Sequence, residues 1–241
     1  MIRQAVIVAG GLGSRFGDRT KLMPKGFIEI DGVPMVERSV QKLIAAGIEE
    51  IIIGTGHCSG YYDELAEKYH IIKTVRNDNY MNTSSMGTLE VCVPYIKGDF
   101  LLLESDLVYD SVGLKVLQNE QRPNVILASG KSNSHDEVYL AADDDGILYE
   151  VSKNKEIIPN PSGELVGITR ISKSCLDKMM AYYKSDKSLI KLDYESALKQ
   201  VSISSEPVFV HKVEYYAWTE IDDESMLDRA LNQIYPRIKE N

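Results

Sequence analysis

The sequence predicts an α/β fold with a Rossmann-like, mostly parallel mixed sheet that is covered by helices. Short apolar runs alternate with helix-like segments over the first 110 residues. The runs contain few polar residues, which is typical of strands buried on both faces. Parallel strands connected by helices require right-handed crossovers, so helices are expected on both faces of the sheet.

The first half of the chain alternates between the two types of element. A segment beginning at Pro34 has apolar residues on one helical face and ends at Gly47, where a left-handed cap is favourable. Further helices are expected at residues 60–69 and 83–93. The strands that these helices connect are expected at residues 5–9, 50–54, 71–75 and 99–104.

The second half is richer in strands. Asp145-Gly146 separates two short apolar segments, and this dipeptide predicts a hairpin. Strands are expected at residues 125–129, 138–142, 147–151, 165–171 and 208–213, and helices at 175–183, 194–201 and 224–234. We therefore expect one α/β domain over residues 1–241, in which the second part adds a β-rich lid.

Composition and charge narrow the classes of protein. The 241 residues include 27 Lys and Arg against 36 Asp and Glu, a formal net charge of −9. This balance argues against a surface for nucleic acid or anionic lipid, while a small anion needs only a few cations in one pocket. The three cysteines lie far apart, and no apolar run approaches the roughly 18–20 residues of a membrane span. We expect a cytoplasmic protein that binds neither nucleic acid nor membranes.

A glycine-rich turn after the first strand is the strongest local signal. Consecutive glycines let the backbone approach a ligand closely and offer N–H groups to phosphate oxygens. Arg15 and Lys25 add two positive charges near this turn. The pattern predicts a phosphate-binding site formed by Ala9, Gly10, Gly11, Gly13, Ser14, Arg15 and Lys25.

Two other nucleotide motifs do not fit. A dinucleotide fingerprint requires a third glycine where Phe16 stands, which argues against hydride chemistry. A Walker A loop ending at Gly130-Lys131-Ser132 requires an earlier glycine at the position of Val125.

The turn and Pro24-Lys25 together resemble the signature of the nucleotidyltransferases that activate sugar phosphates and phosphocholine. That signature is usually written L-A-A-G-x-G-x-R…P-K, and Gly10 replaces its second alanine. Residues 101–106 resemble the family's apolar strand that ends in a metal-binding aspartate. Residues 218–222 resemble the late segment that supplies a second one. The resemblance therefore extends over nearly the whole chain.

Within this family, the chain resembles the bacterial phosphocholine cytidylyltransferases and the related CTP:2-aminoethylphosphonate cytidylyltransferases. Residues 76–80 and the following segment 82–85 carry this similarity. The resemblance implies that Ser84 and Ser85 contact the base of the nucleotide and that this base is cytosine. It also implies a nucleotide-binding half at about residues 1–122 and an acceptor-binding part at about 123–241.

The implied reaction requires no nucleophile from the protein. It joins a phosphate or phosphonate oxygen to the α-phosphorus of CTP, so catalysis depends on positioning and on neutralising charge. The resemblance makes Asp106 and Asp222 the ligands of Mg²⁺, a cation that prefers carboxylates and water. Lys25 and Arg15 are expected to complete the catalytic set by offsetting charge as pyrophosphate leaves.

The acceptor is expected to bind in the second part of the chain. Phosphocholine enzymes are expected to have a tryptophan where this chain has Val138, so one wall of a choline cage is missing. A primary ammonium instead requires carboxylates and hydroxyls, and Asp136 and Asp193 are near the candidate segments. This favours 2-aminoethylphosphonate as the acceptor. The expected acceptor-binding residues are Lys131, Glu137, Lys153, Tyr194, Glu195 and Trp218.

Three alternatives stay open. Phosphocholine, for which Tyr194 and Trp218 offer aromatic faces, and a sugar 1-phosphate are alternative acceptors. A nucleotide-binding regulatory subunit without turnover is the alternative from another class, and the four catalytic candidates together argue against it. A homo-oligomer and one domain of a larger enzyme are both compatible with the sequence.

Overall fold

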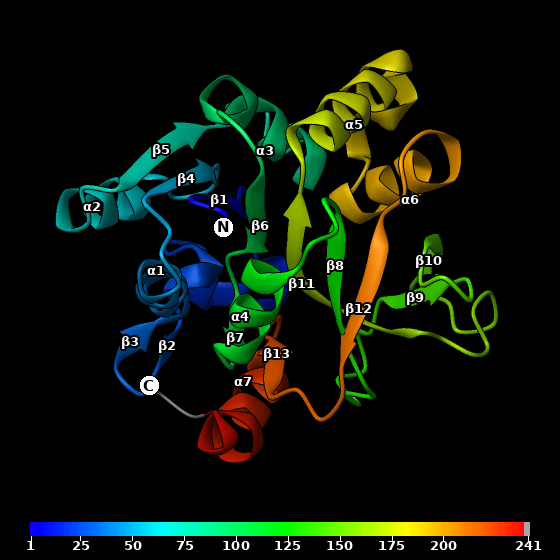
Figure 1. Cartoon of the computed structure of the whole chain (residues 1–241). Helices are drawn as coiled ribbons and strands as arrows, with labels where there is room; N and C mark the ends of the chain where they lie inside the picture. The colour runs from blue at the N-terminus through cyan, green and yellow to red at the C-terminus, as the bar shows by residue number, and fades with distance from the viewer. Residues whose placement is uncertain (239–241) are drawn as a thin grey trace.

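The computed structural model describes residues 1–238, which are organised around a nine-stranded mixed sheet (Figure 1). Its strands are β1 (Gln4–Ala9), β4 (Glu50–Thr55), β5 (Ile72–Arg76), β6 (Phe100–Glu104), β8 (Val125–Ser129), β9 (Tyr139–Ala142), β10 (Leu148–Ser152), β11 (Gly163–Ile171) and β12 (Phe209–Val213). The main order is β10-β9-β11-β6-β1-β4-β5, and β8 and β12 continue from β11. Strands β6, β1, β4 and β5 are parallel to one another, whereas β11 runs antiparallel to β6.

Seven α-helices are present among the described residues: α1 (Met35–Ala45), α2 (Gly60–Lys68), α3 (Ser85–Cys92), α4 (Val112–Asn119), α5 (Lys173–Ser185), α6 (Tyr194–Ser204) and α7 (Glu224–Arg229). Helices α1, α2 and α4 contribute to one hydrophobic core, and α3, α5 and α6 contribute to a second. The two sets therefore cover opposite faces of the sheet, as the sequence predicts. Within residues 1–238, no helix has the length and apolar content that crossing a bilayer requires.

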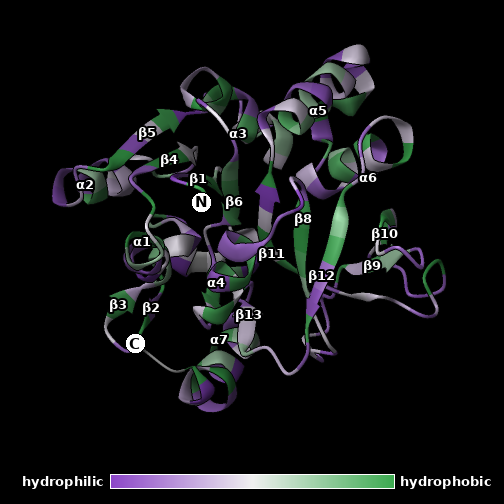
Figure 2. Cartoon of the chain, viewed as in Figure 1, coloured by the Kyte–Doolittle hydropathy of each residue, from purple (hydrophilic) through white to green (hydrophobic). Residues whose placement is uncertain are grey.

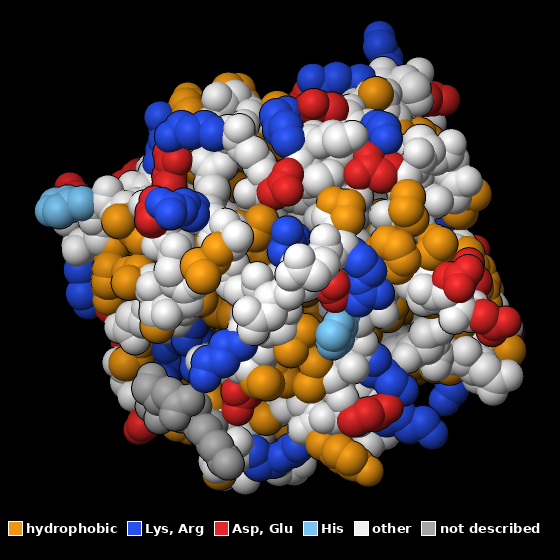
Figure 3. Space-filling view, viewed as in Figure 1, with side chains coloured by type: hydrophobic (Ala, Val, Ile, Leu, Met, Phe, Trp, Pro, Cys, Tyr) orange, Lys and Arg blue, Asp and Glu red, His pale blue; other side chains and the backbone are white. Residues whose placement is uncertain are grey.

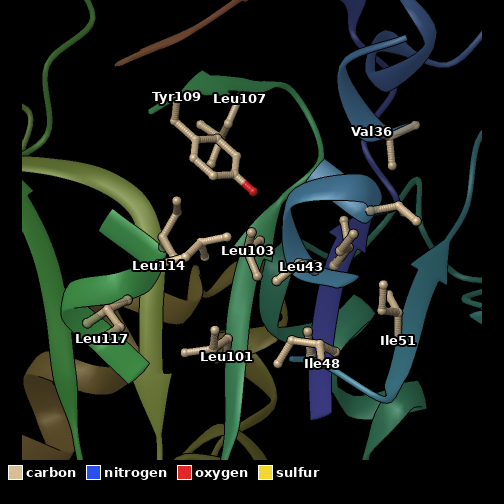
Figure 4. Close-up of a cluster of buried hydrophobic side chains, with 14 of the residues drawn as sticks. Val36, Leu43, Ile48, Ile51, Leu101, Leu103, Leu107, Tyr109, Leu114 and Leu117 are labelled. Carbon is tan, nitrogen blue, oxygen red and sulfur yellow. The ribbon is translucent and has the colours of Figure 1, made fainter. Parts of the chain in front are cut away.

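Alternate residues of the central strands supply the two cores. Ile51 and Ile53 belong to the first core, and Ile52 between them belongs to the second. Leu101, Leu103 and the helix residues Leu43 and Leu114 meet in the first core (Figure 4). Figure 2 shows hydrophobic residues along the central strands and hydrophilic ones in the loops around β9 and β10. Burial on both faces explains why these strands are apolar at successive positions.

Several short elements lie outside the sequence-based expectations. Strands β7 (Leu107–Tyr109) and β13 (Trp218–Glu220) form an antiparallel pair, and β2 (Glu29–Ile30) pairs with β3 (Val33–Pro34). Helix α4 was also not expected from the sequence. The closing helix spans the expected residues, as α7 over Glu224–Arg229 and then as a π-helix over Ala230–Ile234. Residues of β2, β7 and the closing helix contribute to a third, smaller core, whereas α4 packs in the first.

The β-rich second part joins the central sheet through β11. The hairpin β9–β10 pairs with the start of β11, while the end of β11 pairs with β6. Between these pairings lies Gly167, whose φ of +82° is in the left-handed region. A Cβ atom there would lie 2.7 Å from Oε2 of Glu104. The expected lid is thus an extension of the main sheet, and its junction with β6 lies beside a buried carboxylate.

Candidate functional site

A cleft of about 450 Å³ lies where β1 and β6 end, between the two parts of the chain. The glycine turn after β1 and the start of α3 form one side. The segment before β9, the start of α6 and β13 form the other. The carboxyl ends of parallel strands are the usual place for ligands in open α/β sheets.

Close backbone packing positions the glycine turn and Lys25. A Cβ atom on Gly10 would lie 2.4 Å from Oγ1 of Thr88 in α3, so the departure from the family signature makes room for this threonine. Gly13 has a φ of +63°, which favours glycine. A Cβ atom on Gly26 would lie 2.9 Å from the backbone oxygen of Ser105. The segment that carries Lys25 can therefore approach the end of β6.

Lys25 lies at the centre of an acidic group. Its Nζ atom contacts one carboxylate oxygen of Asp106 and one of Asp222, and Oε1 of Glu220 lies 3.7 Å away. Burial alone lowers the pKa of the Lys25 ammonium, but the three carboxylates raise it above its ordinary value. Lys25 therefore stays positively charged at neutral pH, as a partner for anionic groups must.

Three carboxylates converge beside Lys25. One oxygen each from Glu104, Asp106 and Glu220 lies within 4.8 Å of the others. Burial and the charge of Asp106 raise the pKa of Glu104 to about 7, and the same causes raise the pKa of Glu220 well above its ordinary value. Oδ1 of Asp106 is buried and has no hydrogen-bond partner among the described residues. Oxygen donors with an excess of negative charge fit a hard divalent cation such as Mg²⁺.

A series of ion pairs crosses the mouth of the cleft. Nη1 of Arg15 lies 2.7 Å from Oδ2 of Asp136, and Nη2 of Arg15 lies 2.8 Å from Oδ2 of Asp222. Nζ of Lys153 lies 2.8 Å from the other carboxylate oxygen of Asp136. Burial raises the pKa of Asp136, but Lys153 and Arg15 lower it below its ordinary value overall. One carboxylate thus holds two cations that come from opposite sides of the cleft.

The start of α3 faces the start of α6. The Oγ atom of Ser84 donates a hydrogen bond to Asp193, and the backbone N–H of Tyr194 donates one to Oγ of Ser85 at 2.8 Å. Nζ of Lys191 donates to the backbone oxygen of Met81 at 3.0 Å. These contacts connect the expected base-contacting serines to the acceptor side.

A second concentration of carboxylates lies at the start of α6. The hydroxyl of Tyr194 donates to Oε1 of Glu104 at 2.8 Å. Burial, followed by the charges of Asp193 and Glu104, raises the pKa of Glu195 to about 8. Glu104, Asp193 and Glu195 all line the cleft. Such carboxylates are suited to a cationic ligand, which relieves their mutual repulsion.

Most of the residues expected from the sequence converge on this cleft. Its lining includes Ala9, Gly10, Gly11, Gly13, Lys25, Ser84, Ser85, Asp106, Glu137, Lys153, Tyr194, Glu195 and Trp218. Arg15 and Asp222 reach it through the ion pairs described above, while Ser14 is exposed at the start of the 3₁₀-helix Ser14–Thr20. Lys131 does not line the cleft and faces a separate cavity beside α7.

Glu104 and Glu220 were not assigned a role from the sequence. Each lies two residues before an expected metal ligand, Asp106 or Asp222. In extended backbone, residues i and i+2 point to the same side. Both strands end at the glutamates, so only the short distance along the chain, and not a shared strand face, indicated that they would lie near the aspartates.

The sheet and the cleft at its carboxyl edge define the class: an α/β protein of the nucleotidyltransferase type, in which a glycine-rich turn and Lys25 lie beside a group of carboxylates. The chain matches the family described as MobA-like NTP transferase domain over residues 5–197 and belongs to that family.

Relatives and solved structures agree with this assignment. The chain is 32% identical over 105 residues to a 2-aminoethylphosphonate cytidylyltransferase of Lancefieldella rimae, an alignment that spans 43% of each protein. It is 22% identical to a choline-phosphate cytidylyltransferase of Streptococcus pneumoniae, with 91% of this chain and 93% of that protein aligned. The structure of the inositol-1-phosphate CTP transferase from T. maritima superposes with a TM-score of 0.83, 16% identity and coverage of 99% and 98%. The chain spans less than half the length of the first two curated relatives that it matches.

Proposed function

We propose that this chain transfers CMP from CTP to 2-aminoethylphosphonate and releases pyrophosphate, as a cytoplasmic step of phosphonate biosynthesis. A phosphonate oxygen forms a bond to the α-phosphorus of CTP. The bond from that phosphorus to the α–β bridging oxygen breaks, and its electron pair leaves with pyrophosphate. The names of two relatives, 2-aminoethylphosphonate cytidylyltransferase and CMP-5'-(3-aminopropyl)phosphonate synthase, support an aminoalkylphosphonate acceptor.

The nucleotide binds along the glycine turn in this proposal. Lys25 and Arg15 offset charge on the triphosphate, and Ser84 and Ser85 contact cytosine. Asp106 and Asp222, whose carboxylates both reach Lys25, hold Mg²⁺. When bound, Mg²⁺ supplies charge neutralisation for the phosphate oxygens. When the substrate binds, Arg15 and Lys153 leave the carboxylate of Asp136 and contact oxygens of the substrate. A doubly charged phosphonate group competes well with one carboxylate for two cations.

One observation carries the choice of acceptor: the half-buried carboxylates of Glu104 and Glu195 line the end of the cleft at the start of α6. Glu104 and Glu195 have raised pKa values because they are desolvated near other carboxylates. A primary ammonium neutralises this excess and donates three hydrogen bonds. A trimethylammonium group is bulkier and leaves these oxygens without donors, at a cost to binding.

The test is a pyrophosphate-release assay with each of the four ribonucleoside triphosphates and a panel of acceptors. We expect turnover with CTP and 2-aminoethylphosphonate, and a kcat/KM at least roughly tenfold above that for phosphocholine, or about 1.4 kcal/mol. Equal or reversed preference would make phosphocholine the better assignment, and Tyr194 and Trp218 in the cleft lining give that alternative its physical basis. Binding of CTP without turnover of any acceptor would instead favour a regulatory subunit.

A further inference from the structure

A second hollow lies behind the wall of the cleft, between the segment after β8 and α7. Two adjacent cavities of about 500 Å³ and about 270 Å³ share four polar or charged lining residues: Lys131, Ser132, Arg229 and Arg237. We call this hollow the basic cavity. It lies at the same end of the sheet as β13 and α7 (Figure 1).

The three cations of the basic cavity have no carboxylate partner within residues 1–238. Arg229 donates to the backbone oxygen of Ser132 at 2.6 Å and to Oγ1 of Thr219 at 3.0 Å. Arg237 donates to a backbone oxygen, that of Tyr215, at 3.1 Å. Lys131 is exposed and makes no hydrogen bond or ion pair to a described residue. Three cations thus line one cavity, and none of them forms an ion pair with a carboxylate among residues 1–238.

Two acidic residues, Glu214 and Asp228, also line the basic cavity, but neither forms an ion pair with its three cations. Glu214 pairs with Lys212 at 2.6 Å, and Asp228 accepts a hydrogen bond from Asn232 at 2.9 Å. Elsewhere on the surface, cations and carboxylates are interspersed, as on the face in Figure 3. In a chain of net charge −9, three cations that share one cavity without an ion pair are unusual and require a physical reason.

The electrostatics of Arg229 support the same conclusion. Burial lowers the pKa of its guanidinium, the carboxylates of Glu137 and Glu164 raise it in part, and the neighbouring charge of Arg237 lowers it further, with a net decrease. The hydroxyl oxygen of Ser132 is buried and has no hydrogen-bond partner among the described residues. A bound anion would reduce the repulsion between the guanidiniums and could accept a hydrogen bond from this hydroxyl.

We propose that the basic cavity is a second anion site, which binds a small molecule through a phosphate or diphosphate group. Planar guanidiniums and an ammonium match the oxygens of such a group in charge and in hydrogen-bond geometry. The site is separate from the catalytic cleft, but the two share a wall, since Ser132, Ser134 and Met226 line both.

The only tryptophan of the chain provides a direct test. Trp218 lies in that wall and lines both the cleft and one region of the basic cavity. The experiment is a titration of Trp218 fluorescence with inorganic pyrophosphate, without divalent cations and at an ionic strength held constant with NaCl. Inorganic phosphate serves as a second probe. The full chain is compared with three double variants of equal charge change.

The cavity variant is Lys131→Gln/Arg237→Gln, and the cleft variant is Arg15→Gln/Lys153→Gln. The control is Lys115→Gln/Lys187→Gln, two exposed lysines that line neither space. Melting curves check that each variant folds.

For the wild type and the control variant we expect two binding phases. The cavity variant should weaken one phase at least tenfold and leave the other within twofold, and the cleft variant should do the reverse. Because these titrations measure only the binding of pyrophosphate, their outcome does not depend on whether the protein turns over any acceptor. A titration of the cavity variant that matches the wild type, or a single phase abolished by the cleft variant, would overturn the proposal. Self-association that the cavity variant abolishes, without a second pyrophosphate phase, would overturn it in favour of an interface between copies.

Discussion

Arg15 and Lys153 lie on opposite sides of the cleft and share one carboxylate, at 2.7 Å and 2.8 Å from the two oxygens of Asp136. If an anionic acceptor replaces this carboxylate, Lys153→Ala should raise the acceptor KM and leave kcat nearly unchanged. A hydrogen bond to a charged group is worth about 1.5–3 kcal/mol, so the increase should be roughly tenfold or more. Steady-state kinetics at saturating CTP measure it. The exposed Lys155→Ala is the matched control, and an equal effect of both variants would contradict the prediction.

Asp106→Asn and Asp222→Asn should each lower kcat by about 10²–10³, since groups that stabilise developing charge have effects of this size. Stability should change little, because each substitution removes one charge from a site with excess carboxylates. We expect a melting temperature within about 4 °C of the wild type. Addition of EDTA should abolish turnover of the wild type, and Mg²⁺ should restore it. Near-normal turnover in a folded variant would remove that aspartate from the metal site.

Glu195→Gln should raise the KM for 2-aminoethylphosphonate by about tenfold, because the amide cannot neutralise the ammonium. The KM for CTP should stay within twofold. The ratio of kcat/KM values for 2-aminoethylphosphonate and phosphocholine should therefore decrease. An unchanged ratio would place the ammonium away from the start of α6.

Gly167→Ala should destabilise the fold, because it combines a φ of +82° with a Cβ atom 2.7 Å from Glu104. A non-glycine residue in such a conformation costs about 1–3 kcal/mol. Urea denaturation measures the difference. Gly98→Ala is the control, since a Cβ atom on Gly98 meets nothing within 4 Å. A destabilisation of Gly167→Ala no larger than that of the control would show that β11 relaxes locally.

Glu206 should make stability depend on pH. It accepts hydrogen bonds from Lys178, Asn124 and Ser174 at 2.7–2.9 Å. Burial raises its pKa, but these donors, with Lys178 first, lower it to about 2. Because the folded pKa is below the unfolded value of about 4.3, the stabilisation is complete above about pH 5 and is lost as the pH falls toward 2.

Glu206→Gln should therefore reduce the free energy of unfolding at pH 7 by up to about 3 kcal/mol. The difference from the wild type should shrink steadily below pH 4.5. Urea denaturation across this range measures it. The exposed pair of Arg3 and Glu49 provides the control, since Glu49→Gln should cost no more than about 1 kcal/mol at any pH. A difference that does not vary with pH would contradict the prediction.

A secondary-structure element could be predicted from the sequence only where its pattern of apolar residues was long enough to recognise. The strand at residues 100–104 was predicted because burial on both faces makes it continuously apolar. Strands β7 and β13 have three residues each, too few for any period to appear. The glycine turn, Lys25 and Asp106 were found because they belong to local motifs. The position of Lys131 could not be predicted. The segment that carries it is held in part by Arg229, which lies far along the chain and donates a hydrogen bond to the backbone oxygen of Ser132.

The pairing of the antiparallel strand β11 with β6 has a consequence for folding during synthesis, because β11 leaves the ribosome long after β6. Strand β6 pairs with β1 on one edge and with β11 on the other, where Phe100 lies opposite Ile171 and Leu103 opposite Ile168. A nascent chain that has emerged only to residue 122 therefore carries an unprotected hydrophobic edge, which invites association with other chains. The two parts of the chain therefore share one sheet through β11. We expect a chain that ends before β11 to expose this edge of β6 and to associate with other chains.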